Sequence, residues 1–234
     1  MLSQELKDRI EKIKVVAMDL DGVLTDGRII YGDYGDELKF FDVQDGFGLA
    51  LLREAGLKTV IVSSRKSRTH QRRAGELKIT KLYQNVKDKL KCFQEILKRY
   101  KLRPEEICFI GDDWVDAPIL SRAGLAVAVS NAVPEIKELA HYVTQKLGGR
   151  GAVREVADLL LKGLGRREET RELRQPEDGR SAGEVFHARR PAHHVHGIPI
   201  PYLSNRRARC DHLRVVTGLS SDLHQRKAAG PRRI

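Results

Sequence analysis

The feature that most limits the fold of this chain is an alternation of short apolar runs with amphipathic segments between residues 1 and about 165. The apolar runs are β-prone, lack polar alternation and end at polar or glycine residues, which is typical of buried parallel strands. These strands are expected at residues 15–20, 59–63, 81–84, 107–110 and 125–129. Helices are expected between and after them, at residues 47–55, 89–100, 117–123, 133–140 and 152–164. The alternation predicts an α/β domain with a doubly wound parallel sheet.

One segment departs from this alternation. Residues 28–43 read RIIYGDYGDELKFFDV, which places two β-prone stretches on either side of a turn rich in Gly and Asp. Such a pattern predicts a β-hairpin that projects from the domain.

The composition changes after Gly165. Residues 166–234 contain fifteen Lys and Arg, fourteen of them Arg, against eight Asp and Glu, and they include no apolar run long enough for a core element. We therefore expect residues 1–165 to form the folded domain and residues 166–234 to be a basic, disordered or weakly structured tail. The Arg-rich, Lys-poor composition would also fit translation in a shifted frame.

The loose basic charge of this tail could bind a nucleic-acid backbone in a salt-sensitive way. The tail has no aromatic interleaving and no metal-ligand spacing among its histidines, such as His193, His194 and His196. We therefore expect neither a nucleic acid partner nor a metal site there.

The cysteines and the N-terminus bear on the compartment. Cys92, Cys108 and Cys210 show no paired spacing, which argues against a disulfide framework. The N-terminus is charged, and no run approaches the roughly eighteen apolar residues of a membrane span. These features favour a soluble protein in a reducing cytoplasm, without a membrane partner.

Two aspartates follow the first apolar run, in the sequence VVAMDLDG. Asp19 and Asp21 would lie beyond the carboxyl end of a strand, where ligands bind in open α/β sheets. One carboxylate could attack phosphorus or bind a metal, while the other transfers protons. A calcium loop is excluded because Val23 and Leu24 occupy positions that require an acidic residue and Gly. The plain alternative is an acidic surface turn.

A second acidic group follows another apolar run, in ICFIGDDWVDAP. The acids at this strand end are Asp112, Asp113 and Asp116. Asp112 and Asp116, together with Asp19, could bind magnesium, which prefers carboxylate oxygens together with water and substrate phosphate. The alternative is a helix start capped by aspartates.

Two further strand ends carry groups suited to phosphate. Ser63, Ser64 and Arg65 end the run TVIVSSR and could bind phosphate oxygens through hydroxyl, backbone N–H and guanidinium groups. Lys89 opens a helix after a strand, where its ammonium group could balance carboxylates and a phosphoryl group. Taken singly, these are also an ordinary loop and a solvated lysine.

In this order, the four groups resemble the four motifs of the haloacid dehalogenase superfamily, over residues 10–165. The resemblance implies a Rossmann-like fold, with Asp19 as a nucleophile that forms an aspartyl-phosphate and Asp21 as general acid and base. It also implies that Ser63 binds phosphate and that Lys89 is the charge-balancing base.

The same resemblance implies a site for Mg²⁺. Asp19 and Asp112 would be direct ligands and Asp116 would act through water. The backbone carbonyl of Asp21 would complete the protein ligands.

The spacing of the motifs excludes a cap domain. About forty residues separate Asp21 from Ser63 and fewer than thirty separate Ser63 from Lys89, whereas most domains exceed roughly fifty residues. We therefore expect a capless member whose hairpin shields the active site of a neighbouring subunit.

The chain is similar, more closely, to the 3-deoxy-D-manno-octulosonate 8-phosphate phosphatases of lipopolysaccharide synthesis. The stretches that carry this likeness include GDDWVDAPIL and GGRGAVREVADLLL. The likeness implies a homotetramer with hairpins in a central barrel, a small sugar-acid phosphate as substrate, and Arg65 and Arg150 as ligands of its sugar and carboxylate end. The chain departs from the common Thr-Gly-Arg pattern of the family at Ser63 and Ser64.

Two other functions remain open at this point. A nonulosonate 9-phosphate phosphatase would share the core motifs, although the GGRGA segment fits it less well. A noncatalytic oligomeric module of phosphatase-like fold is the third reading, and the presence of Asp19, Asp21, Lys89 and Asp112 argues against it.

Overall fold

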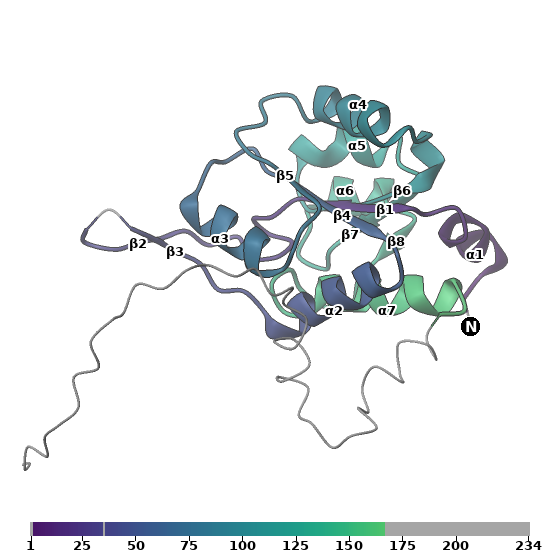
Figure 1. The fold of residues 1–234 in the computed structure, drawn as a ribbon, viewed down its shortest axis with the longest axis horizontal. Helices are drawn as coiled ribbons and strands as arrows, with labels where there is room; N and C mark the ends of the chain where they lie inside the picture. The colour runs from purple at the N-terminus through teal and green to yellow at the C-terminus, as the bar shows by residue number, and fades with distance from the viewer. Residues whose placement is uncertain (1, 35, 167–234) are drawn as a thin grey trace, which may run out of the picture. The chain divides into compact units, whose positions relative to one another are not determined.

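A computed structural model describes residues 2–34 and 36–166 of the chain. Within this part, α-helices alternate with the strands of one parallel sheet (Figure 1). The predicted disorder of the basic tail, together with its histidines and Cys210, lies outside the described residues apart from Arg166.

The central sheet has six strands in the order β5-β4-β1-β6-β7-β8, and all neighbouring pairs run parallel. The strands are β1 (Val15–Met18), β4 (Lys58–Val62), β5 (Lys81–Tyr83), β6 (Ile107–Gly111), β7 (Leu125–Ala128) and β8 (Tyr142–Val143). From β1 the chain first moves outward through β4 and β5, then returns to β6 and moves out the other way. The carboxyl ends of β1 and β6 therefore flank the point where the strand order reverses, which is where open α/β sheets bind ligands.

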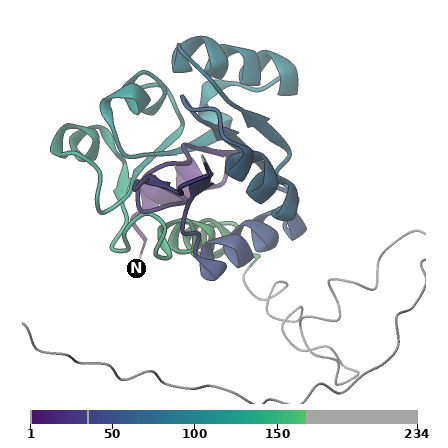
Figure 2. The same ribbon diagram turned by 90° about the vertical axis from the view of Figure 1, so that its left-hand side faces the viewer.

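Helices cover both faces of the sheet. They are α1 (Gln4–Ile10), α2 (Val43–Glu54), α3 (Arg68–Glu76), α4 (Lys89–Tyr100), α5 (Ala117–Leu120), α6 (Pro134–Leu139) and α7 (Ala152–Gly163), with 3₁₀ turns η1 (Pro104–Glu106) and η2 (Trp114–Asp116). Helices α2 and α7 pack together on one face, and α4 and α5 pack on the other (Figure 2). Because both faces are covered, β1, β6 and β7 are buried along their whole length.

The doubly wound parallel sheet predicted from the sequence is confirmed, and each of the five predicted strands and five predicted helices is present within a few residues of its expected bounds. Two helices and one strand were not predicted: α1, α3 and β8. Helix α3 was not predicted because it lacks an apolar stripe: of its nine residues, only His70 and Ala74 are buried.

The projecting hairpin is also present. Strands β2 (Ile30–Tyr31) and β3 (Glu37–Leu38) pair antiparallel and extend away from the parallel sheet (Figure 1). Its large apolar side chains face solvent in the single chain, with Tyr31 71% exposed and Phe40 67% exposed. This surface is unusual for a monomer, because exposed apolar patches commonly mark contacts.

The part of the chain that the structure describes bears on the cysteines and on membrane spans. Cys92 and Cys108 are buried free thiols. No helix there has the length and apolar character that crossing a membrane requires.

Asp45 joins α2 to the start of α7. Its buried carboxylate accepts hydrogen bonds from the backbone N–H groups of Gly151, at 3.2 Å, and Arg154, at 2.8 Å. Gly151 has φ +95°, which a residue with a side chain would rarely adopt. The carboxylate therefore satisfies N–H groups that begin a helix without partners of their own, and it fixes the glycine-rich segment before α7.

This anchor predicts a pH-dependent loss of stability in Asp45→Asn. Burial raises the pKa of Asp45 to about 6, so the folded chain binds the proton more tightly than the unfolded chain. The contribution of Asp45 to the free energy of unfolding therefore declines as the pH rises from about 4 through about 6. At about pH 5 the protonated carboxyl group still has an oxygen at both positions, whereas Asn places an NH₂ group opposite one backbone N–H, so urea unfolding should show a loss of about 1 kcal/mol.

That difference should narrow as the pH rises toward 7, because only the wild type titrates in this range. The matched control is Asp158→Asn, which removes a half-exposed ion pair with Arg154 on α7 and should change stability by less than about 0.5 kcal/mol. Equal behaviour of the two variants at every pH would contradict the anchoring role.

Candidate active site

The parallel sheet brings four sequence motifs to one edge. Asp19 follows β1, Ser63 follows β4, Asp112 follows β6, and Lys89 begins α4 after β5. Their convergence depends on the strand order, because β1 lies between β4 and β6 with Met18 level with Ile61 and Ile110.

Lys89 lies between two buried carboxylates. Its Nζ is 2.6 Å from Asp116 Oδ1 and 3.1 Å from Asp19 Oδ2, and the lysine is only 4% exposed. Burial alone would lower the pKa of Lys89, but the charges of Asp19 and Asp116 outweigh it and raise that pKa. Lys89 therefore carries a positive charge beside Asp19.

One carboxylate oxygen of Asp19 accepts a backbone hydrogen bond, and the other faces Lys89. Its backbone N–H donates to the Ile110 carbonyl, and its Oδ1 accepts from the Leu20 N–H at 2.7 Å. Burial raises the pKa of Asp19 to about 6, although Lys89 partly offsets that effect. A cation close to Asp19 would favour the ionised, nucleophilic form.

Within the described residues, the Asp112 carboxylate makes no hydrogen bond or ion pair. Asp19, Asp112 and Asp116 can each offer an oxygen such that the three atoms lie within 4.8 Å of one another. The Oδ1 of Asp112 is buried without a hydrogen bond. Burial, followed by the charges of Asp19 and Asp116, raises the pKa of Asp112 to about 8. A buried, unpartnered carboxylate among like charges fits a divalent cation with oxygen ligands.

Asp116 has a supporting position. Its Oδ1 accepts from Lys89, while its Oδ2 accepts from the backbone N–H groups of Asp112, at 3.1 Å, and Asp113, at 3.4 Å. Because both oxygens are engaged, Asp116 orients the Asp112 loop and Lys89.

The loop after Asp21 is packed tightly against Asp112 and the glycine-rich segment. A side chain on Gly22, whose φ is +94°, would meet Asp112 Oδ2 at 2.0 Å, and one on Gly148 would meet the Gly22 carbonyl oxygen at 1.7 Å. Asn131 donates to the Gly22 carbonyl at 3.0 Å and accepts from the Gly148 N–H. Gly149 donates to the Val23 carbonyl at 2.8 Å. The segment therefore fixes the loop of its own chain.

Asp21 faces a different set of groups from Asp19. Lys39 Nζ lies 2.5 Å from Asp21 Oδ1, while His70 Nε2 and Arg65 Nε lie 3.3 Å and 3.7 Å from Oδ2. The His70 contact is close but misaligned for a hydrogen bond. Burial would raise the pKa of Asp21, but His70 and Lys39 outweigh it and hold that pKa below its ordinary value.

The predicted phosphate ligands are placed unequally. Ser63 is buried at the end of β4, and its Oγ accepts from the Arg65 N–H at 3.2 Å. Ser64 is exposed. Arg65 pairs with Glu37 of the hairpin at 3.5 Å and lies near Asp21. The structure thus brings Ser63 and Arg65 to the site, with Ser64 at its surface.

Arg150 is not brought into this cluster. It is exposed in the turn before α7, and its side chain makes no hydrogen bond or ion pair with the residues that the structure describes. Any contact of Arg150 with substrate would need another element to approach it.

Four site residues were missed by sequence reasoning: Lys39, His70, Glu37 and Asn131. Lys39 and Glu37 lie in the hairpin, which the sequence presented only as a projection, and His70 lies on the unpredicted helix α3. Their sequence signal was weak, because their contacts depend on how distant segments fold back toward the loop after β1.

Known proteins resemble this chain in sequence and in structure. Residues 75–154 match the haloacid dehalogenase-like hydrolases. The 3-deoxy-D-manno-octulosonate 8-phosphate phosphatase of Yersinia pestis is 42% identical over 160 residues, which span 68% of this chain and 86% of that enzyme. The chain belongs to this phosphatase family of haloacid dehalogenase-like hydrolases.

Further relatives agree with this membership. The Escherichia coli phosphatase of the same description is 40% identical over 170 residues, covering 73% of this chain and 90% of that enzyme. The Moraxella catarrhalis phosphatase was solved in complex with a magnesium ion, a phosphate ion and a KDO molecule. Its structure matches with a TM-score of 0.72 and 37% identity, covering 74% of this chain and 100% of that chain.

These findings confirm several expectations. The resemblance to the family and the α/β fold are confirmed, and family membership confirms that the chain is an enzyme of the phosphoric monoester hydrolase class. The roles of individual side chains remain predictions.

The unpartnered oxygen of Asp112 generates a test of metal binding. A divalent cation at 100 times its dissociation constant should stabilise the wild type by about 2.7 kcal/mol. Asp112→Asn should lower cation affinity more than about tenfold, because it removes an anionic ligand. The melting temperature with and without Mg²⁺ measures this effect.

Asp113→Asn is the matched control, since Asp113 is exposed and its capping of the Trp114 N–H can be retained by Asn. It should keep the wild-type response to Mg²⁺. An unchanged response in Asp112→Asn would show that Asp112 is not a ligand.

Proposed function

We propose that the chain is a Mg²⁺-dependent phosphatase that hydrolyses 3-deoxy-D-manno-octulosonate 8-phosphate to KDO and phosphate in lipopolysaccharide biosynthesis. The observation that carries this proposal is the buried arrangement of Asp19, Lys89 and Asp112 in a chain 42% identical to the Yersinia pestis phosphatase. The arrangement offers a nucleophile, a fixed positive charge and a cation-binding carboxylate in one place.

The first proposed step transfers the phosphoryl group to the enzyme. An oxygen of Asp19 forms a bond to phosphorus, and the bond from phosphorus to the sugar oxygen breaks. The leaving oxygen takes a proton from Asp21. Asp21 is held as a carboxylate before substrate arrives, but the roughly doubly negative phosphate raises its pKa on approach and favours protonation.

The second step releases phosphate. Asp21, now a carboxylate again, takes a proton from a water molecule whose oxygen bonds to phosphorus. The bond between phosphorus and the Asp19 oxygen breaks, and Asp19 is restored. Lys39 and His70 favour the charged form of Asp21, which is the form this step needs.

Mg²⁺ would be held by Asp19, Asp112 and the backbone carbonyl of Asp21, with Asp116 orienting the loop. When bound, Mg²⁺ supplies positive charge to the phosphoryl oxygens. Lys89 adds fixed positive charge beside Asp19 and orients that carboxylate.

At the substrate end of the site, two arginines are proposed to bind the sugar acid. Arg65 lies beside Asp21 and can pair with a carboxylate or hydroxyl of a sugar acid. Arg150 is exposed, so we propose that it contacts substrate only in an assembled oligomer. A nonulosonate 9-phosphate phosphatase would use the same catalytic residues, whereas the GGRGA segment favours the octulosonate.

We also propose that the hairpin joins copies of the chain, most simply in a homotetramer. Its exposed apolar side chains support this assembly, including Tyr34, which is 100% exposed, and Leu38, which is 54% exposed. A neighbouring subunit could then cover an active site over which the described residues form no cap domain.

A panel of sugar-acid phosphates tests the function. With Mg²⁺, the wild type should release phosphate fastest from 3-deoxy-D-manno-octulosonate 8-phosphate, and nonulosonate 9-phosphates should follow. Asp19→Asn should lose at least about 10³-fold in kcat, because the amide cannot form the acyl phosphate. Phosphate release at saturating substrate measures both effects.

Each rival reading has its own outcome. Preference for the nine-carbon acids would replace the proposed substrate. Inactivity of the wild type on the whole panel, matched by Asp19→Asn, would favour the noncatalytic module. Asp88→Asn, which changes an exposed helix cap next to Lys89 but retains capping, serves as the control and should remain active.

A further inference from the structure

A buried lysine at the base of the hairpin contacts the proposed acid–base residue. The Lys39 side chain is 0% exposed, and its Nζ lies 2.5 Å from Asp21 Oδ1 and 2.9 Å from Glu37 Oε1. A buried ammonium group is costly unless it is paired and hydrogen-bonded. Lys39 therefore has few positions open to it, and one of its two anchors is Asp21.

The other neighbours of Asp21 hold it less firmly. His70 Nε2 is 3.3 Å away but misaligned for a hydrogen bond, and Arg65 Nε is 3.7 Å away. The Thr25 hydroxyl donates to Oδ1 at a long 3.4 Å. Among the described residues, Lys39 thus makes the shortest contact to the Asp21 carboxylate.

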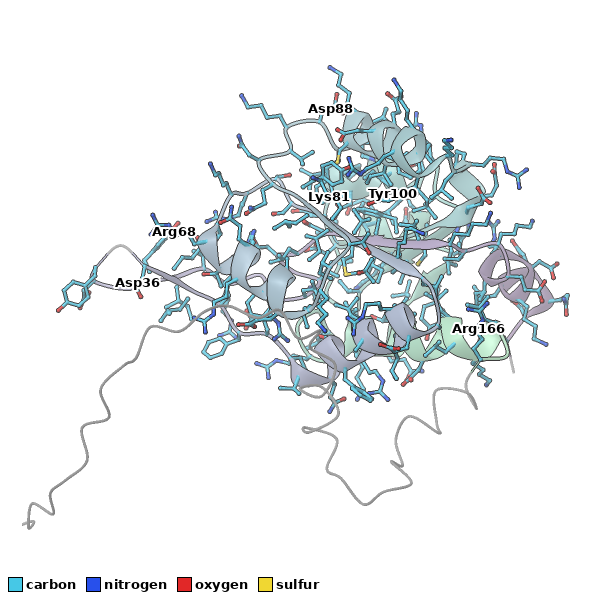
Figure 3. All side chains as sticks on the ribbon, in the orientation of Figure 1. Asp36, Arg68, Lys81, Asp88, Tyr100 and Arg166 are labelled. Carbon is cyan, nitrogen blue, oxygen red and sulfur yellow. The ribbon has the colours of Figure 1, made fainter. Side chains whose placement is uncertain are left out.

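The base of the hairpin is itself tied to the domain. Glu37 pairs with both Lys39 and Arg65, and the Thr69 hydroxyl on α3 donates to the Glu37 carbonyl at 2.9 Å. Figure 3 shows Asp36 on the hairpin and Arg68 at the adjoining start of α3. These contacts fix the base of the hairpin, while its apolar part projects. A change in the position of the hairpin would therefore move Lys39 and, through it, the Asp21 carboxylate.

We propose that Lys39 is a positioning residue that orients the Asp21 carboxylate, and that the hairpin controls proton transfer through it. The inference rests on the proposed function, because it takes Asp21 as the acid and base. Lys39 need not touch substrate. Its effect is to restrict the Asp21 side chain to the orientation from which protons are delivered and accepted, and such placement can change a rate by about 100-fold.

Lys39→Met tests the proposal by removing the charge while keeping an unbranched side chain. We expect kcat to fall about 10- to 100-fold with KM within about threefold, because Asp21 is misplaced while substrate binding is retained. Lys39→Arg should recover most of the lost kcat.

The readouts separate positioning from a general structural role. Rates are referred to the folded fraction of each variant, measured by urea unfolding, so unfolded protein does not enter them. Lys39→Gln, which keeps a hydrogen-bond donor, gives a second variant and should fall between Met and Arg. Lys91→Met, at an exposed lysine of α4, is the control and should match the wild type.

Three results would overturn the proposal: an unchanged or increased kcat in Lys39→Met, a raised KM with unchanged kcat, or no recovery in Lys39→Arg. The raised KM would instead make Lys39 a substrate ligand. Inactivity of the wild type on every sugar-acid phosphate would refute the proposed function, and the inference with it, in a distinguishable way.

Discussion

The pairing of Lys89 with Asp19 and Asp116 is the interaction on which the rest of the site depends. Three carboxylates gather in a buried space at the edge of the sheet, and like charges so close would repel without compensation. One ammonium group offsets part of that charge and leaves Asp112 unpartnered. The excess of negative charge that makes this arrangement costly also makes it suited to a divalent cation. Stability and catalytic capacity are therefore opposed at this edge.

Much of the fold and of the catalytic cluster could be predicted from the sequence, because both follow from short-range patterns. Buried parallel strands read as continuous apolar runs, and Asp19, Ser63 and Asp112 come directly after such runs. A parallel sheet places those positions at one edge. Lys89 followed from the same logic, since it opens the helix after β5.

The remaining site residues could not be predicted because their contacts depend on tertiary geometry. His70 lies on a helix with almost no apolar face, and Lys39 lies in a hairpin whose pattern indicated only that it projects. A role for Arg150 in substrate binding was predicted only from the family resemblance, and in the single chain Arg150 is exposed. The resemblance implied a role for the glycine-rich segment in substrate binding. In this structure Gly148 and Gly149 pack on the loop after Asp21 of their own chain.

The central claim is that the Asp19 side chain is phosphorylated during turnover, and chemical trapping tests it most directly. Acid quench of the working enzyme followed by borohydride reduction should convert an aspartyl phosphate to homoserine, which peptide mass spectrometry can locate. The account predicts homoserine at position 19 only when both Mg²⁺ and substrate are present. Homoserine at another aspartate, or substrate turnover with no modified residue, would contradict it.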